Sequence, residues 1–460
     1  MGLENHTERA RVSEEREISP SHVEEPARVT SRQRASQGGL GIPDQVQFHI
    51  MSFEGPDAYA RVGGLETRVS GLSHALVAAG HETHLWFVGD PDLPAGELRG
   101  GLHLHRWCQW LSRHHPSAVY DGEDSKASDY AASLPPHLAS SLMPHLRSGG
   151  FAVVLAEEWQ TVNAVLHLDH LLRQAGLRER VRILWNANNV FGFDRIDWGR
   201  LRAASVITTV SRYMRQIMRL SGVEAITIPN GLSPDAYVPP DPAVVAQLRR
   251  GFAGRTVLTK LARWDPDKRW LETVELVARL RALNMKPLLV ARGGREPHGV
   301  EVLRAMRNSG LSIVERTCAS DDGNSLVQAL SNVGDTDIVH LISHVEPYSR
   351  RALFHASDVV LANSCHEPFG LVGLEAMAVG AVACTGCSGE DYAFAGRNAL
   401  VLQGSDAAEF VELYGQLVTD PAYPTALRRA GRITARQFAW PEVIRRNLVP
   451  RLRLPERRLS

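Results

Sequence analysis

The chain has 460 residues, an apolar fraction of 44% and equal numbers of basic and acidic residues, 51 of each. This length predicts two domains, and the balanced charge argues against a nucleic acid as the main partner. No run of about 18–20 apolar residues predicts a transmembrane segment, and the N-terminal residues lack the apolar segment of a signal peptide. The five cysteines are irregularly spaced, so we expect reduced thiols in a cytoplasmic protein.

Residues 1–44 contain no Phe, Trp or Tyr and predict a disordered tail. From Val46 onward, short apolar runs alternate with amphipathic segments, which is typical of an α/β fold with parallel sheets. In the first half of the chain, strands are expected at Val46–Ile50, His84–Gly89, Phe151–Ala156, Val181–Trp185, Ser205–Thr209 and Ala225–Ile228, and a helix at Thr67–Ala79.

Four prolines between residues 234 and 243 mark a domain boundary. We expect a first domain over 45–235, a linker over 236–250 and a second domain over 251–437. Its strands are expected at Thr256–Leu261, Pro287–Ala291, Asp337–Ile342, Val359–Ala362, Ala381–Cys384 and Ala399–Leu402, and helices at Trp270–Leu283, Ser349–Ala356, 405–418 and 421–437. The polar stretch 318–336 is interpreted as a surface excursion. The basic end, 445–460, is interpreted as a solvated helix face or as a weak peripheral contact to an anionic membrane surface.

Two loops after predicted strands carry residue types that suit a ligand. Gly63 and Gly64 follow the first strand, where missing side chains let the backbone approach a ligand, although a flexible turn gives the same pattern. In the second domain, residues 366–380 predict a tight turn and a helix, with Glu367 in the turn and Glu375 about one helical turn into the helix. A helix N-terminus favours anions, and open α/β sheets bind ligands at such turns.

Taken in chain order, the motifs of this sequence resemble those of the glycogen-synthase-like superfamily of retaining glycosyltransferases, of the family 4 type. That superfamily has the two-domain GT-B fold, which is built from Rossmann-like domains. The resemblance covers roughly residues 46–445. Its most specific part is the pair Glu367 and Glu375, in an E-x7-E pattern. The other similar elements are Gly63-Gly64-Leu65-Glu66, Val210-Ser211, Ile228-Pro229-Asn230-Gly231, Arg263, Lys268 and Ala435–Trp440. The last of these implies a C-terminal helix, 438–460, that crosses back to the first domain.

The resemblance implies transfer of a hexosyl unit, with retention, from a nucleotide diphosphate sugar to a sugar or other hydroxyl acceptor. Arg263 and Lys268 would neutralise the diphosphate, Glu367 would contact the donor sugar and Glu375 the ribose. The remaining expected donor-binding residues are Gly63, Gly64, Phe369, Gly370, Leu371 and Val372. Because side-chain cations take the role that a divalent metal plays elsewhere, we expect no metal and no cofactor beyond the donor itself.

Two positions depart from the family pattern. Asn188 stands where many relatives carry a His against the donor sugar, and it is grouped here with Glu367, Arg263 and Lys268 as a candidate catalytic residue. Asn can hydrogen-bond a sugar hydroxyl but cannot carry a proton. Likewise, Glu157-Glu158-Trp159 replaces a His-Asp-Trp segment. The alternatives are therefore a catalytically weak or inactive protein that binds nucleotide sugars, or a GT-B epimerase. The glycine loop lacks the G-x-G-x-x-G spacing of a nicotinamide-dependent dehydrogenase.

Overall fold

The computed structural model describes residues 40–43 and 45–452. The predicted disordered tail, 1–44, lies almost entirely outside these residues. At the end of that stretch, Leu40 and Ile42 are buried in the core of the first domain together with Phe48. The core of this domain therefore includes residues that precede the first expected strand.

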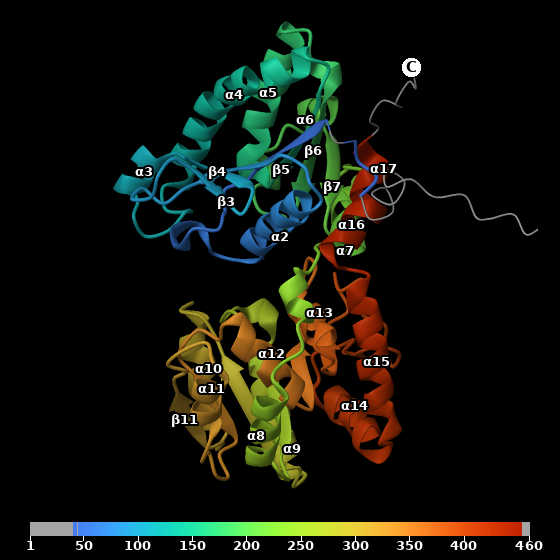
Figure 1. The fold of residues 1–460 in the computed structure, drawn as a ribbon. Helices are drawn as coiled ribbons and strands as arrows, with labels where there is room; N and C mark the ends of the chain where they lie inside the picture. The colour runs from blue at the N-terminus through green and yellow to red at the C-terminus, as the bar shows by residue number, and fades with distance from the viewer. Residues whose placement is uncertain (1–39, 44, 453–460) are drawn as a thin grey trace, which may run out of the picture. The chain divides into compact units, whose positions relative to one another are not determined.

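The first sheet has eight strands among the described residues, in the order β3-β4-β2-β1-β5-β6-β7-β8, and all are parallel except β3. Figure 1 labels β3, β4, β5, β6 and β7 of this sheet. The strands are β1 (Val46–Met51), β2 (Thr83–Val88), β3 (Gly96–Arg99), β4 (Leu102–Trp107), β5 (Phe151–Glu157), β6 (Val181–Ala187), β7 (Val206–Thr209) and β8 (Ile226–Thr227). Six of them match the predicted strands within a few residues, whereas β3 and β4 were not predicted.

Helices cover both faces of this sheet. Successive residues of a strand point to opposite faces, and apolar residues lie on each face, so both faces must be covered. Phe48 and Ile50 of β1 pack in the same core as α2, whereas Met51 packs in the core formed with α4, α5, α6 and α7. The helices are α2 (Gly64–Ala78), α3 (Gln109–His114), α4 (Glu123–Arg147), α5 (Val162–Gln174), α6 (Trp198–Ala204) and α7 (Arg212–Leu220). Helix α2 begins at Gly64, so the predicted glycine loop is the N-terminus of this helix.

The second sheet has seven parallel strands within the described part of the chain, in the order β11-β12-β10-β9-β13-β14-β15. The strands are β9 (Thr256–Leu261), β10 (Pro287–Arg292), β11 (Ile313–Arg316), β12 (Ile338–Leu341), β13 (Val359–Ala362), β14 (Ala383–Thr385) and β15 (Leu400–Val401). Strand β9 has the predicted bounds. Both sheets are thus open and parallel-rich, as expected for two Rossmann-like domains.

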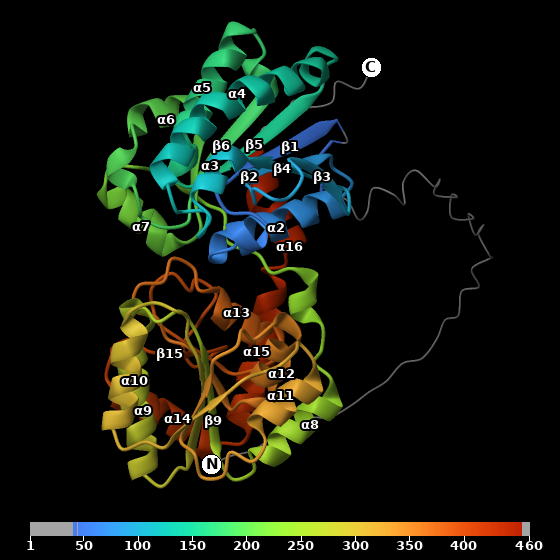
Figure 2. The same ribbon diagram turned by 90° about the vertical axis from the view of Figure 1, so that its left-hand side faces the viewer.

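Helices also cover both faces of the second sheet, with α9, α10 and α14 on one side and α8, α11 and α12 on the other (Figure 2). The helices are α8 (Pro242–Gly251), α9 (Trp270–Ala282), α10 (His298–Asn308), α11 (Gly323–Leu330), α12 (Pro347–Ala356), α13 (Leu371–Ala378), α14 (Ala407–Thr419) and α15 (Ala422–Arg436). Most of the predicted linker, 236–250, is helix α8, which buries Val244, Val245 and Leu248 in this layer.

The stretch 318–336 is not the surface excursion that its polarity suggested. Helix α11 lies within it and buries Leu326, Ala329 and Leu330 against α8 and α12. Asp322 caps this helix by accepting a hydrogen bond from the Ser325 amide at 2.8 Å. The sequence suggested a loop because polar residues at the helix cap and on both flanks outnumber the few apolar residues of this short helix.

After α15 the chain returns to the first sheet through α16 (Trp440–Val443), a π-helix (Ile444–Leu448) and α17 (Val449–Leu452). The Leu232 amide donates to the Phe438 carbonyl at 2.8 Å, and the Trp440 amide donates back to the Leu232 carbonyl at 3.2 Å. The Trp440 ring fills a notch at Gly71 and Gly231, where an added Cβ would lie 2.2 and 2.5 Å from ring atoms. Of the predicted crossing segment, 438–460, the part from Trp440 to Leu452 thus packs on the first domain, whereas the Phe438 ring lies beside Phe369 and Tyr392 of the second. Residues 453–460 lie outside the described residues.

Residues 40–43 and 45–452 include no helix that combines the length and the apolar character needed to cross a bilayer.

Candidate active site

A cleft of about 1020 Å³ lies where the carboxyl ends of strands from both sheets carry their loops. It receives the loops after β1, β5 and β6 from the first sheet and those after β9 and β13 from the second. Nine of the eleven predicted site residues line it: Gly63, Gly64, Asn188, Arg263, Lys268, Glu367, Phe369, Gly370 and Leu371. The position agrees with the rule that open α/β sheets bind ligands beyond the carboxyl ends of their strands.

The other two predicted residues, Val372 and Glu375, lie further along α13 and are not part of the cleft lining. Glu375 forms an ion pair with Arg350, with 3.3 Å between Glu375 Oε1 and Arg350 Nη2. Helix α12, which carries Arg350, thereby fixes this carboxylate at the edge of the site.

The second-domain wall of the cleft carries the charged group that the sequence predicted. Lys268 Nζ lies 2.5 Å from Glu367 Oε2, and the Ser364 hydroxyl donates to the same oxygen at 3.0 Å. The side chains of Lys268 and Glu367 are only 19% and 17% exposed. Arg263, by contrast, is 59% exposed and has Asp265 at 3.8 Å. The wall therefore holds one ordered cation and one cation that extends into solvent.

The turn before α13 requires glycine at position 370. Gly370 has φ of +77°, and an added Cβ would lie 2.9 Å from Glu390 Cγ and 3.0 Å from Glu367 Cγ. The Tyr392 hydroxyl donates to the Gly370 carbonyl. Burial raises the pKa of Glu390 to about 7, and the charge of Glu367 adds to this shift. The turn thus packs over a second carboxyl group that sequence reasoning missed.

On the first-domain wall, Glu54 holds the N-terminus of α2. Its Oε2 accepts hydrogen bonds from the amides of Gly63 and Glu66, both at 3.0 Å, and Tyr120 donates to its Oε1 at 2.7 Å. A carboxylate at this position satisfies two of the free amides at the positive end of the helix. The sequence offered one signal for Glu54, an acidic residue three positions after the end of β1.

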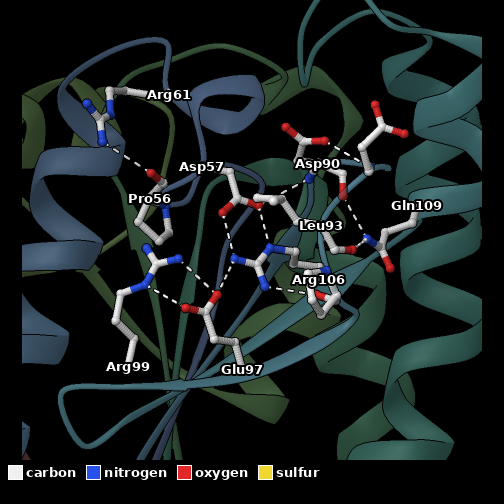
Figure 3. A network of polar contacts seen from close by, with 11 residues as sticks. Pro56, Asp57, Arg61, Asp90, Leu93, Glu97, Arg99, Arg106 and Gln109 are labelled. Atoms are coloured by element: carbon white, nitrogen blue, oxygen red, sulfur yellow. Dashed lines mark hydrogen bonds and ion pairs between the residues drawn. The ribbon is translucent and has the colours of Figure 1, made fainter.

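A buried ion-pair network holds the loop between β1 and α2 (Figure 3). Arg106 of β4 donates to both carboxylate oxygens of Asp57, at 2.8 and 3.0 Å, to Glu97 at 2.7 Å and to the Pro94 carbonyl at 2.8 Å. The side chains of Arg106 and Asp57 are 0% and 1% exposed. Because Asp57 lies between Glu54 and the glycines, this network fixes the path of the chain into the cleft.

Asn188 is held by the two glutamates that replace the family's His-Asp-Trp segment. Its amide nitrogen Nδ2 donates to Glu157 Oε2 at 2.8 Å, and its backbone N–H donates to Glu158 Oε1 at 2.5 Å. Glu157 also accepts from Arg68 at 3.0 Å and from Asn186 at 2.8 Å. The Asn188 side chain can therefore offer its oxygen to a ligand while its nitrogen remains bound to Glu157.

Glu158 is the most perturbed acid that lines the cleft. Burial raises its pKa to about 8, and the neighbouring charge of Glu157 adds to the shift. Its backbone has φ of +66°, which residues other than glycine rarely adopt, and the Trp185 indole N–H donates to its carbonyl at 2.9 Å. A strained, neutral carboxyl group beside Asn188 can donate a hydrogen bond to a substrate at neutral pH.

The Glu158→Gln variant is expected to gain stability relative to the wild type as pH rises from about 5 to about 8. The raised pKa means that the folded protein holds a proton that the unfolded chain releases above its ordinary carboxyl pKa, about 4.3. That stabilisation is complete below the unfolded pKa and is lost as pH rises through the folded pKa, with a slope of at most about 1.4 kcal/mol per pH unit. Urea unfolding across this range measures the difference.

The control for this experiment is Glu412→Gln, on an exposed position of α14. Its stability difference from the wild type should not change over the same pH range. A Glu158→Gln difference that is equally flat would contradict the assignment of a neutral Glu158.

Two family models match the chain, one on each side of the domain boundary. "Glycosyltransferase Family 4" matches residues 62–236, and "Glycosyl transferases group 1" matches residues 277–420. The D-inositol 3-phosphate glycosyltransferase of Streptomyces avermitilis is 26% identical over 305 residues, which are 64% of this chain and 60% of that protein. Its counterpart from Pseudarthrobacter chlorophenolicus is 34% identical over 123 residues, 26% of this chain and 29% of that one. The matches thus span less than two thirds of these relatives' own length.

Solved structures share the fold over most of the chain. Sucrose-phosphate synthase from Thermosynechococcus elongatus has a TM-score of 0.60 at 20% identity, covering 86% of this chain and 96% of that one. The catalytic domain of starch synthase IV from Arabidopsis thaliana has a TM-score of 0.59 at 17% identity, covering 86% of this chain and 96% of that one. The motifs, the two sheets and the family models on both domains agree, and the chain belongs to the superfamily of family 4-type glycosyltransferases with the GT-B fold.

Proposed function

We propose that the protein transfers a hexosyl unit from a nucleotide diphosphate sugar to a hydroxyl acceptor, with retention and without a catalytic metal. The observation that carries this proposal is the group of Arg263, Lys268 and Glu367 beside the N-terminus of α13, on one wall of a cleft lined by both domains. Two side-chain cations and a helix N-terminus offer positive charge where a diphosphate leaving group would develop negative charge.

In this proposal each residue has a separate role. Lys268 and Arg263 bind the diphosphate oxygens, and Glu367 accepts hydrogen bonds from the donor sugar. Glu375 is assigned to the ribose, although it lies outside the cleft lining and is bound by Arg350. The acceptor attacks from the same face that the leaving group departs, and a diphosphate oxygen takes the acceptor proton. Asn188 orients the sugar through its amide oxygen, and Glu158 donates a hydrogen bond beside it.

The printed descriptions of related proteins guide the choice of substrates. The relatives from Stackebrandtia nassauensis and Streptomyces avermitilis are named for D-inositol 3-phosphate, and two structural neighbours contain UDP-2-fluoro glucose or UDP with glucose. We therefore place UDP-, ADP- and GDP-sugars in the donor panel, and inositol 3-phosphate and simple sugars and sugar phosphates in the acceptor panel. The five free cysteines support an intracellular location, which is also a proposal.

The test is release of nucleoside diphosphate across this panel, with NMR assignment of the product's anomeric configuration and with EDTA in a parallel series. We expect consumption of one donor class, an unchanged rate in EDTA and retained configuration. Inverted configuration or loss of activity in EDTA would contradict the corresponding part of the proposal. No consumption and no binding of any donor by folded protein would contradict the whole proposal.

A second candidate is a protein that binds a nucleotide sugar without turning it over. It is favoured by Asn188, whose nitrogen is bound to Glu157 in the place where relatives have a titratable His. Calorimetry separates the two functions, because donor binding without product supports the second and measurable turnover excludes it. Inversion at sugar C2 without an acceptor would instead indicate an epimerase.

A further inference from the structure

A group of histidines lies on one face of the first sheet, at the amino ends of its strands. His49 of β1 is paired in register with His84 of β2, which is paired with His103 of β4. The ring centroids of neighbouring pairs are 4.5 Å apart, and both pairs are stacked. His105, two residues further along β4 and paired in register with Trp86, also stacks on His84, with 5.2 Å between the ring centroids. Because the strands are parallel, this group lies at the sheet edge opposite to the cleft loops.

Glu82 lies beside His84, on the side of the histidine group that faces solvent. Its Oε1 lies 3.1 Å from Nε2 of His84, and one ligand atom each from Glu82, His84 and His103 lie within 4.8 Å of one another. The Glu82 side chain is 50% exposed and that of His84 is 14% exposed. The three side chains therefore converge at a position that a dissolved ion can reach.

Two further side chains hold these groups in the orientation that metal ligands need. His84 Nδ1 lies 3.0 Å from His105 Nε2, which leaves His84 Nε2 facing Glu82. Gln47 donates to the other oxygen of Glu82, Oε2, at 2.8 Å, which leaves Oε1 facing His84. Ligating His and carboxylate groups in proteins typically have such outer partners, which fix the tautomer and the orientation.

We propose that Glu82, His84 and His103 form a binding site for a divalent transition metal such as Zn²⁺, with water as the remaining ligand. Two imidazoles and one carboxylate suit Zn²⁺ better than Mg²⁺ or Ca²⁺, which prefer oxygen ligands alone. Tetrahedral Zn²⁺ requires its ligand atoms to lie about 3.3 Å apart. His84 and Glu82 are already near that separation, and a rotation of the half-buried His103 side chain would bring a ring nitrogen closer to them. The ion would link β2 to β4 and has no part in sugar transfer.

The experiment uses the full chain, stripped of metal with EDTA and titrated with ZnCl₂ by calorimetry at pH 7. We expect one Zn²⁺ per chain at this site, and a tetrahedral visible spectrum when Co²⁺ replaces it. Gln47→Leu should weaken the affinity about 10–100-fold, as is typical for a residue that orients a ligand. His103→Ala and Glu82→Gln remove a ligand and should weaken it at least as much.

The matched control is His170→Ala, which removes an exposed histidine of α5 away from this group and should bind Zn²⁺ as the wild type does. Thermal unfolding gives a second readout that does not depend on activity: Zn²⁺ should raise the melting temperature of the wild type and of His170→Ala, but not that of His103→Ala. Equal affinity in His103→Ala, Glu82→Gln and the control, or no binding by the wild type, would overturn the proposal.

Discussion

Replacement of Lys268 with alanine is expected to lower the rate of sugar transfer by about 10²–10³-fold, the usual cost of removing one group that stabilises transition-state charge. Lys268 is the ordered cation of the cleft wall, held 2.5 Å from Glu367. Its loss would leave the more exposed Arg263 to neutralise the diphosphate. The effect should appear in kcat, measured by release of nucleoside diphosphate from the donor identified in the panel, because the charge develops as the bond breaks.

Two further variants make this result specific. Lys268→Arg keeps the positive charge and should retain more activity than Lys268→Ala. Arg304→Ala removes an exposed cation of α10 outside the cleft and should leave the rate unchanged. The fold should survive in Lys268→Ala, because Ser364 still donates to Glu367. If the alanine variant were folded and as fast as the wild type, Lys268 would have no part in catalysis.

Replacement of Arg106 with alanine is expected to reduce the free energy of unfolding by about 3–5 kcal/mol, the range for breaking a buried ion pair from one side. The substitution would leave the Asp57 carboxylate, which is 1% exposed, without its guanidinium partner. It would also remove the hydrogen bond that Arg106 donates to Glu97 (Figure 3). The Pro94 carbonyl would lose its hydrogen bond from Arg106 as well. Urea denaturation monitored by circular dichroism measures the loss.

Arg99→Ala provides the matched control within the same network. Arg99 also binds Glu97 through two hydrogen bonds, at 2.8 and 2.9 Å, but its side chain is 50% exposed. Exposed ion pairs contribute about 0–1 kcal/mol, so this variant should be nearly as stable as the wild type. Equal losses for Arg99→Ala and Arg106→Ala would show that burial of the network does not determine its contribution.

The sequence predicted those parts of the fold that local patterns encode. Strand β9 was predicted with its observed bounds because the run Thr256–Leu261 combines Val and Leu with β-branched Thr and has turn-forming residues nearby on both sides. Strand β4 was not predicted, although its LHLHRW pattern alternates apolar and polar residues as a half-buried strand does. Helix α4 was missed because Pro135, Pro136 and Pro144 lie inside it, and such residues normally end a helix.

The residues of the candidate site likewise divide into those that the sequence predicted and those that it did not. Gly370 and Glu367 belong to one short local motif, so the sequence was enough to bring them together. Glu54 and Glu390 were missed because their importance arises from partners distant in the chain or from burial, as in the contact between Glu54 and Tyr120, 66 positions away. Such contacts exist only once the sheets have formed, and a single sequence does not reveal them.

The notch that Trp440 fills has a consequence for how the protein can be divided. Residues 440–452 complete a core that begins at Leu40, so the first folding unit is discontinuous in sequence. A fragment ending at residue 235 would expose the apolar surface that Trp440, Ile444 and Leu448 now cover. Chimeras that exchange the second domain between relatives should therefore take residues 438–452 from the same parent as the first domain, with junctions on both sides of the Leu232–Ala439 bridge.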